Sequence, residues 1–252
     1  MTRRNALFLI CSALLAVLFV RLGVWQLHRR SERRARNAIE GRRLSAPPVP
    51  LADLPRDPAA ARFRRVRVVG RYDFAHELLY TNRIRDGAPG VQVLTPLRPD
   101  SGFGGDTVVM IDRGWVYAPD GATIDVGRWR EPERLDGVGY VEPFTRSAPG
   151  ASEDPAGAHP ERFRWLDRSR IGARVGRPVA PFYVALAPDT AADAAAGPPR
   201  TPVRVPPPPL DEGPHLSYAI QWFSFAVIAI AGALLVVFVL PRRRSPSRGG
   251  VA

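Results

Sequence analysis

Residues 215–222 read His-Leu-Ser-Tyr-Ala-Ile-Gln-Trp, and they open a span without charged residues that runs to Leu240. A helix over this span would be roughly 37 Å long, which is enough to cross a bilayer with some tilt. On a helical wheel, its polar and aromatic residues fall within roughly a third of the circumference, a set made of His215, Tyr218, Gln221, Trp222 and Phe225. The opposite side, which we expect to face lipid, holds Leu216, Ile220, Phe223 and Val227. Because polar groups at the mouth of a membrane helix need a partner, the first face predicts a contact with a ligand or with another helix.

A second apolar span covers residues 6–27, behind Arg3 and Arg4. A secretory signal peptide is the competing interpretation, because it also joins a short basic segment to an apolar core. No clear small-x-small cleavage site precedes the charged stretch, and Trp25-Gln26 is typical of a helix end at headgroup depth. We therefore predict a membrane protein with one transmembrane helix at each end and a mostly antiparallel, β-rich α+β domain between them.

The composition is strongly basic, with 36 Lys or Arg residues and a formal net charge of +12. All of these residues are arginine, which indicates a bias toward GC-rich codons and not a phosphate-binding surface. The basic runs flank the two spans, at residues 29–43 and 242–248, where anionic headgroups supply the counter-charge. We therefore expect membrane lipids among the partners and no nucleic acid. The single cysteine, Cys11, excludes an intrachain disulfide.

The central region alternates between hydrophobic and polar residues from Phe63 to Tyr72, as expected for a strand with one buried face. Further strands are predicted at residues 77–84, 91–97, 107–117, 135–144 and 179–186, with a turn at Asp86-Gly87. Residues 28–43 predict a helix that leaves the membrane and ends at Gly41, and residues 167–174 predict a short helix. The Pro-rich stretch 189–214 predicts an extended strut, and residues 145–160 predict a loop.

No familiar catalytic signature occurs in the chain, and no two of its four histidines have metal-ligand spacing. We therefore expect a protein that is not an enzyme. Asp112-Arg113-Gly114-Trp115 is best interpreted as an ion pair and a buried aromatic at a strand bend, with partner binding as the alternative. The same two interpretations apply to Asn82-Arg83.

His215 also has two interpretations. It is the start of an interfacial helix with its ring among the headgroups, or it is an axial ligand to a haem iron. In the second case the macrocycle would contact the side chains on the same face, which are those of Tyr218, Gln221, Trp222 and Phe225. His28 would emerge at the same membrane surface and is the candidate for a second ligand.

An ordered set of short motifs resembles the Surfeit-locus-1 family of cytochrome oxidase biogenesis proteins over nearly the whole chain. The set begins with Leu22-Gly-Val-Trp-Gln-Leu27 and Gly70-Arg-Tyr72. It continues with Thr81-Asn-Arg83, Pro89-Gly-Val91, Leu94-Thr-Pro-Leu97, Asp112-Arg-Gly-Trp-Val116 and the opening stretch His215–Trp222. Individually most of these motifs are weak, whereas their order within a two-span layout is specific. The family motif usually has Asn where this chain has Asp112.

The resemblance implies assistance in assembling a haem-a-containing cytochrome c oxidase, at the step where haem a reaches the catalytic subunit. His215 matches the second-helix histidine that is implicated in haem a binding in bacterial members. The implied partners are cytochrome c oxidase subunit I and the haem a synthase. The resemblance also implies a plasma-membrane protein with both termini cytoplasmic, which charge counting alone leaves open.

The expected organisation follows from this topology. It comprises a cytoplasmic N-terminus (1–5), a transmembrane helix (6–27), a juxtamembrane helix and linker (28–62), an extracytoplasmic domain (63–188), a Pro-rich linker (189–214), a second transmembrane helix (215–240) and a basic cytoplasmic tail (241–252).

Two alternatives remain at this point. The first is a haem a chaperone that works through His215. The second is an interaction scaffold that holds oxidase subunits or the synthase without binding haem. Its candidate interaction residues are Trp25, Gln26, Asn82, Arg83, Arg113, Gly114 and Trp115.

Overall fold

The computed structural model describes residues 2–145, 160–188 and 201–239. The chain divides into two compact units, which we describe separately. One unit combines residues 1–39 with residues 210–252, and the other comprises residues 40–209. The predicted basic tail at 241–252 and most of the 145–160 loop lie outside the described residues.

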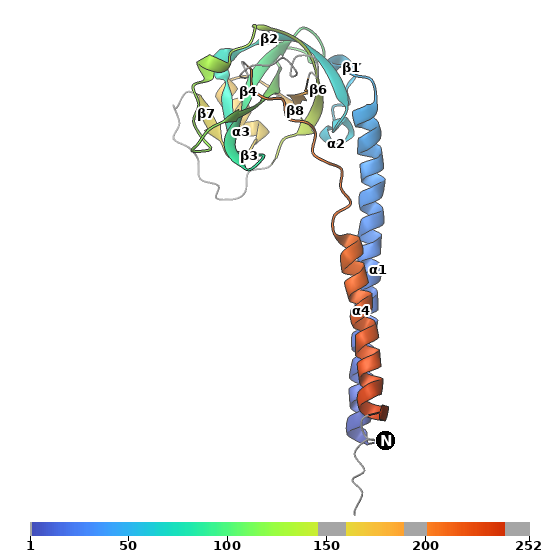
Figure 1. The fold of residues 1–252 in the computed structure, drawn as a ribbon. Helices are drawn as coiled ribbons and strands as arrows, with labels where there is room; N and C mark the ends of the chain where they lie inside the picture. Colours follow the sequence, from blue (N-terminus) through green and yellow to red (C-terminus); the bar gives the residue numbers. More distant parts are fainter. Residues whose placement is uncertain (1, 146–159, 189–200, 240–252) are drawn as a thin grey trace, which may run out of the picture. The chain divides into compact units, whose positions relative to one another are not determined.

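The first unit is a pair of helices, and Figure 1 shows α1 (Arg3–Ser45) and α4 (His215–Leu234) side by side. A π-helical segment, Leu235–Val239, continues α4. Both helices are long and apolar enough to cross a membrane, by length and composition. Small residues are buried where the helices meet, a set made of Ala16, Gly23, Ala219, Ala226 and Ala233. They recur at spacings of seven residues, which lets the two backbones approach each other closely.

Two expectations for these helices are wrong. Phe223 was expected to face lipid, but its ring packs on Gly23, where an added Cβ would lie 2.6 Å from the ring. The helix was expected to end at Gly41, but α1 continues to Ser45. Its last turns are held by contacts within the second unit, because Arg43 donates to the carbonyls of Ala59 and Arg62, and Glu40 pairs with Arg62.

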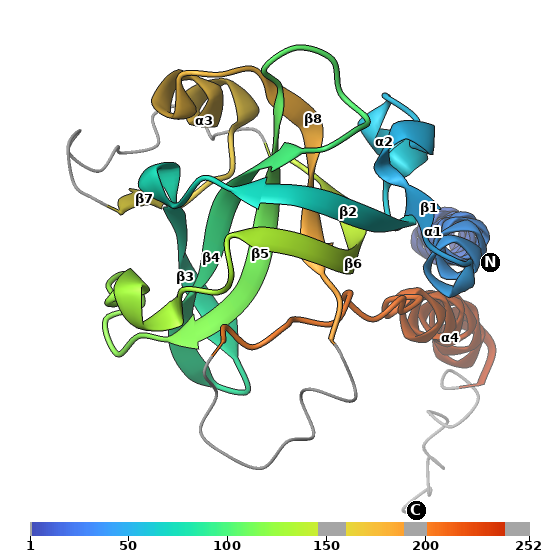
Figure 2. The same cartoon turned by 90° about the horizontal axis from the view of Figure 1, so that it is seen from above.

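The second unit is a β-barrel built from long strands of alternating polarity. Its strands are β1 (Val49–Pro50), β2 (Arg65–Tyr72), β3 (Leu78–Arg85), β4 (Ala88–Pro99), β5 (Val108–Tyr117), β6 (Arg134–Pro143), β7 (Glu161–Phe163) and β8 (Val179–Leu186). The sheet order is β1-β2-β6-β8-β5-β4-β3-β7, and an additional antiparallel pairing of β2 with β4 closes the ring β2-β6-β8-β5-β4. Closure leaves β1 and the β3–β7 pair outside the ring, next to β2 and β4 (Figure 2).

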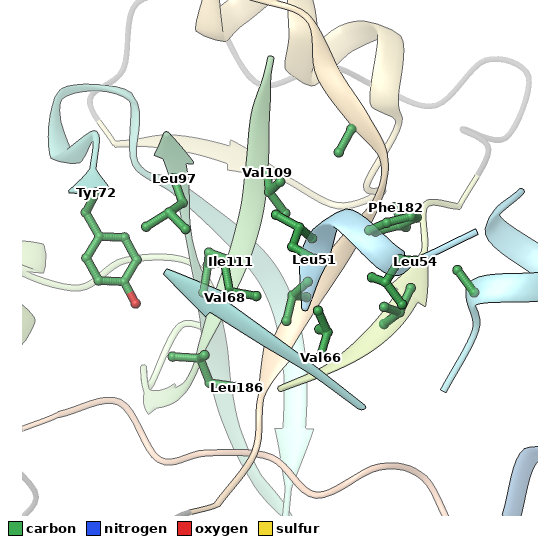
Figure 3. Close-up of a cluster of buried hydrophobic side chains, with 14 residues drawn as sticks. Leu51, Leu54, Val66, Val68, Tyr72, Leu97, Val109, Ile111, Phe182 and Leu186 are labelled. Atoms are coloured by element: carbon green, nitrogen blue, oxygen red, sulfur yellow. The ribbon is translucent and has the colours of Figure 1, made fainter. Parts of the chain in front are cut away.

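The barrel interior is filled by residues from the inward-facing positions of every ring strand. Val66 and Val68 of β2 alternate with exposed or half-buried arginines, and they meet Ile111 of β5 and Phe182 of β8 in one cluster (Figure 3). The short helical turn η1 (Leu51–Asp53) adds Leu51 to this cluster, and α2 (Pro58–Ala61) follows it. The inward alternation read from the sequence therefore corresponds to the barrel core.

The outer face of β4 and β5 carries a second apolar cluster, which is covered by α3 (Arg168–Val175). The Asp167 carboxylate caps α3 by accepting from the backbone N–H groups of Ser169 and Arg170. Ile171 and Val175 of α3 are buried against this face. Two short 3₁₀ turns, η2 (Phe74–His76) and η3 (Val126–Trp129), complete the described elements.

The β-rich α+β prediction is confirmed, and the long strands and the 167–174 helix lie within a few residues of their predicted positions. At Asp86-Gly87, φ values of 50° and 80° show the predicted two-residue hairpin turn. The short strands β1 and β7 were not predicted. They pair in parallel with β2 and β3, as β5 does with β8, so the sheet is mostly but not wholly antiparallel.

Candidate functional site

The polar centre of the helix pair is a hydrogen bond between the first residue of α4 and the buried face of α1. The Nδ1 atom of His215 lies 2.8 Å from the Oε1 atom of Gln26. Gln26 is only 9% exposed, and it lies three residues after Gly23 on the buried face of α1. The expected contact of the His215 face with another helix is therefore made by α1 itself.

This contact favours one tautomer of the neutral imidazole. An amide oxygen only accepts hydrogen bonds, so Nδ1 of His215 must carry the proton and donate. In the neutral ring, Nε2 is then an unprotonated nitrogen with a free lone pair. Gly213 borders that edge of the ring, since an added Cβ there would lie 3.6 Å from Nε2, an ordinary van der Waals distance. Metal-ligating histidines have this arrangement, with one nitrogen held by a polar partner and the other free for the metal.

The residues predicted beside His215 separate into two groups. Trp222 stacks on Phe19 of α1 at 5.7 Å between ring centroids, and Phe225 lies 5.8 Å from the same ring. Tyr218 and Gln221 are exposed, with Tyr218 at 45%. The surface next to His215 that is available to a ligand is therefore formed by Tyr218 and Gln221, while Trp222 supports it from the helix interface.

Two other predicted residues of α1 lie away from the buried face. Trp25 is 53% exposed, as expected for an interaction residue or a ring at headgroup depth. His28 is exposed and follows Gln26 by two positions, which places it nearly on the opposite side of the helix. The structure therefore does not bring His28 together with His215.

The segment just before α4 is held to α1 by charge and amide contacts. Glu212 accepts from Arg30 at 2.8 Å and from Arg34 at 2.7 Å. The side-chain amide of Asn37 donates to the carbonyls of Leu210 and Asp211. These contacts fix the start of α4, and hence His215, against α1. They also hold the pKa of Glu212 below its usual value, chiefly through the hydrogen bond from Arg30.

In the barrel, Arg113 of β5 is at the centre of an internal charge network. Its guanidinium, which is 0% exposed, pairs with Glu77 and with Glu131, the latter at 2.7 Å, and donates to the carbonyl of Trp129. Thr95 donates to Glu77 at 2.7 Å, and Arg204 pairs with the second oxygen of Glu131. The buried Arg113 and the partly buried Arg204 thus neutralise the buried Glu77 and the partly buried Glu131, as needed for charges largely removed from water. Burial still raises the pKa of Glu77.

The next two residues of the motif hold a strap that pairs antiparallel with β5. Gly114 has φ +125°, and an added Cβ would lie 2.4 Å from the carbonyl oxygen of Val203. Trp115 exchanges both backbone hydrogen bonds with Val203 at 2.8 Å, and its indole donates to the carbonyl of Arg83 at 3.0 Å. The strap, residues 201–205, belongs to the stretch predicted as a strut. The alternation Val203-Arg204-Val205 was the signal for a short strand there.

Arg113 and Gly114 are buried, so neither lies on the surface that the scaffold hypothesis assigned to them. The predicted interpretation of this motif as an ion pair at a strand bend fits its geometry. Asn82 is exposed with φ +57°, and the Arg83 guanidinium lies 4.4 Å above the ring of Tyr80. Of the candidate interaction residues in the barrel, Asn82 is therefore the most accessible.

Asp112, where the family resemblance expects Asn, is a buried carboxyl. It accepts from the Gln92 amide at 2.8 Å and from the Gly114 N–H at 2.9 Å. Burial raises the pKa of Asp112 to about 6 in spite of these donors. Among the residues that the structure describes, no group of three or more histidine, cysteine or acidic side chains could hold a metal ion.

The fold and the site together define a class: a β-barrel protein with two apolar, potentially membrane-spanning helices that meet at a histidine–glutamine pair. Residues 13–227 match the model of the SURF1 family. The chain belongs to this family, as its motifs indicated.

The similar proteins span both bacteria and a eukaryote. An uncharacterized SURF1-like protein of Mycobacterium tuberculosis (strain ATCC 25618 / H37Rv) is 28% identical over 97% of this chain and 87% of its own length. A SURF1-like protein of Monosiga brevicollis is 27% identical over 91% of this chain and 85% of its own length. A SURF1-like protein of Rickettsia bellii is 23% identical over 92% of this chain and 90% of its own length. The similarity therefore covers the helices as well as the barrel.

Proposed function

We propose that this protein is a non-catalytic assembly factor for a haem-a-containing cytochrome c oxidase, which assists delivery of haem a to the catalytic subunit. The observation that carries the proposal is the His215–Gln26 hydrogen bond in a SURF1 family protein. This bond leaves the lone pair of Nε2 of His215 available to a metal ion. We further propose that both helices span the plasma membrane, with both termini cytoplasmic and the barrel outside. The expected partners are oxidase subunit I and the haem a synthase.

The residues present fit a haem group at the start of α4. Haem a, when bound, supplies an iron that accepts an imidazole nitrogen. His215 would hold it through Nε2, while Gln26 keeps the proton on Nδ1 and orients the ring. Tyr218 and Gln221 offer an exposed surface beside the imidazole. Trp222, stacked on Phe19, stiffens the helix contact behind it.

The exposure of this site also suits release of the haem. A single protein ligand on a half-exposed surface binds haem less firmly than a closed pocket with two ligands, and His28 lies on the far side of α1. Such a site suits a transient carrier, because the acceptor subunit can supply the remaining contacts.

The test is an absorption spectrum of the purified, detergent-solubilised full chain after co-expression with the haem a pathway. We expect a haem a signal in the wild type that is lost in His215→Ala. His28→Ala is the matched control, since it removes an exposed histidine of the other helix and should retain the signal.

The scaffold hypothesis makes the opposite prediction. If neither wild type nor variant carries haem, while oxidase assembly still depends on the protein and His215→Ala still co-purifies with subunit I, the haem-carrier proposal is wrong. Full oxidase activity after deletion of the gene would reject both versions of the assembly role.

A further inference from the structure

Helix α1 has a second lengthwise face, which no described residue covers. Four exposed residues recur there at spacings of seven positions, in the series Leu7, Leu14, Arg21 and His28. Leu7 and Leu14 are 63% and 66% exposed, more than any other large apolar residue of α1. Arg21 precedes the buried Gly23 by two positions, which turns it by about 200° around the helix axis. This open face therefore lies on the side of α1 that is turned away from α4.

Arg21 is the only charged residue within the apolar span at residues 6–27. It precedes Leu27, the last residue of that span, by about 9 Å along the helix. Because side chains leave an α-helix in the direction of its N-terminus, Arg21 starts toward the middle of the span and not toward its nearer end. Within the described parts of the chain, its exposed guanidinium forms no hydrogen bond or ion pair. In a membrane-spanning α1, this charge needs an anionic partner.

A second copy of this chain does not supply that partner. Residues 6–27 and 216–240 contain no aspartate or glutamate, so neither span offers a carboxylate at the depth of Arg21. A symmetric contact of two copies through the open face would also place two Arg21 side chains at the same depth, where their like charges repel each other.

The chemistry of the open face fits a helix of a different protein. A guanidinium matches a carboxylate in a two-pronged hydrogen bond, and this pair is strongest where water is excluded. Apolar residues at seven-residue spacing are the pattern by which one helix packs along another. Trp25, one turn after Arg21 and 53% exposed, adds a large apolar ring beside the charge.

We propose that the open face of α1 binds a transmembrane helix of another protein, and that an aspartate or glutamate of that helix pairs with Arg21. The inference rests on the proposal that α1 spans the membrane, and it does not depend on haem binding. The haem ligand His215 contacts the other side of α1 through Gln26, so the two surfaces are separate.

The test uses a synthetic membrane-spanning helix as the probe. The full-length protein is reconstituted in phosphatidylcholine vesicles with a dansyl-labelled helix of leucine and alanine, which carries a single Glu or a single Gln at the depth of Arg21. Energy transfer from the tryptophans of the protein to the dansyl group measures association at pH 8, where an ordinary glutamate is ionised. We expect the Glu helix to associate about tenfold more tightly than the Gln helix, as for a charge-assisted hydrogen bond.

Three variants assign this preference to Arg21. Arg21→Leu should bind the two helices equally, and it should enter the membrane at least as well as the wild type because it makes the span more apolar. Arg21→Lys keeps the charge and should retain part of the preference. Arg36→Leu removes an exposed arginine of α1 beyond the apolar span, and this matched control should behave as the wild type does.

The proposal is overturned if the wild type binds the Glu and Gln helices equally, or if Arg21→Leu keeps the preference. Equal binding by the wild type would assign the Arg21 guanidinium to lipid phosphate groups, which a long side chain can reach by bending to the membrane surface. Cys11, the single cysteine and an exposed residue, distinguishes this result from a wrong topology. In the same vesicles, a spanning α1 protects Cys11 from a membrane-impermeant maleimide. Labelling of Cys11 would reject the proposed topology, whereas protection of Cys11 with equal binding would reject only the partner helix.

Discussion

The motif residues of the two units differ in how completely their polar groups are paired. In the barrel, the Arg113 guanidinium and its two carboxylate partners are enclosed and satisfied by one another. In the helix pair, the His215 imidazole is satisfied at Nδ1 by Gln26, and none of the described residues forms a hydrogen bond with Nε2. A buried network whose hydrogen-bonding groups are all paired with one another stabilises a fold. An imidazole that is oriented by one hydrogen bond and has a second, unpaired nitrogen can bind a ligand. The haem ligand that we propose therefore belongs to the helix pair, and the Asp112–Val116 motif of the barrel has a structural role.

The largest effect is expected on the stability of the barrel, when a member of its buried charge network is replaced. Replacing Arg113 by Met should lower the free energy of unfolding by about 3–5 kcal/mol, because Glu77 would remain buried without its charged partner, while Glu131 would keep only Arg204. Urea denaturation of the full chain, followed by tryptophan fluorescence, measures the loss. Arg71→Gln, an exposed arginine of β2, is the control and should change stability by less than about 0.5 kcal/mol.

A double variant sharpens this result. Adding Glu77→Gln to Arg113→Met removes the uncompensated charge and should recover part of the loss. If the double variant is less stable than Arg113→Met alone, the network is held by something other than charge compensation.

The second effect concerns the one residue that departs from the family motif. The folded-state pKa of Asp112 is about 6, compared with an ordinary value of 3.8. Between these pH values the folded chain retains a proton that the unfolded chain has lost, so stability falls as pH rises from about 4 to about 6 and stays lower above that.

Asp112→Asn should therefore be more stable than the wild type at pH 8, by up to about 3 kcal/mol for a pKa difference near two units. At pH 4 the difference should largely disappear. Denaturation curves of both proteins across this range provide the check. A wild type that gains stability between pH 4 and pH 6 relative to Asp112→Asn would contradict the direction of the shift.

The local parts of this structure were readable from the sequence, and the long-range parts were not. Alternation of polarity predicted the long strands, and Asp86-Gly87 predicted its turn, because both depend on neighbouring residues. The partners of Arg113 come from positions 77, 131 and 204, and only the closed barrel brings them together. Closure itself depends on the β2–β4 pairing, for which the sequence has no local signal.

The contacts of the helix pair could be predicted only in part, for a similar reason. A wheel centred on polar residues correctly identified His215 and Trp222 as contact residues but misplaced Phe223. The alanines at 219, 226 and 233 mark the centre of the contact face more reliably, because close helix approach requires small side chains. Reading that seven-residue spacing would have placed Phe223 at the edge of the interface.

The third prediction concerns the hydrogen bond that orients His215. Gln26→Ala removes the acceptor for Nδ1 and should lower haem a affinity by about 10–100-fold, as for other residues that orient a metal-binding histidine. Gln26→Glu keeps an acceptor at the same place and should retain haem, with a more negative reduction potential because a carboxylate raises imidazole basicity. Spectroscopic titration and redox titration measure the two quantities. Equal haem binding by Gln26→Ala and the wild type would show that Gln26 does not position His215.

The smallest effect is expected at the exposed contacts before α4. Glu212 joins Arg30 and Arg34, and all three side chains are at least a quarter exposed, so solvent screens the pairs. Because the hydrogen bond from Arg30 lowers the pKa of Glu212, its contribution is present at neutral pH and is lost as pH falls through that lowered value. Glu212→Gln should therefore leave haem binding unchanged at neutral pH while increasing hydrogen exchange of residues 210–214. If exchange stays the same but haem binding falls, Glu212 acts on the haem site directly and does more than hold the start of α4 against α1.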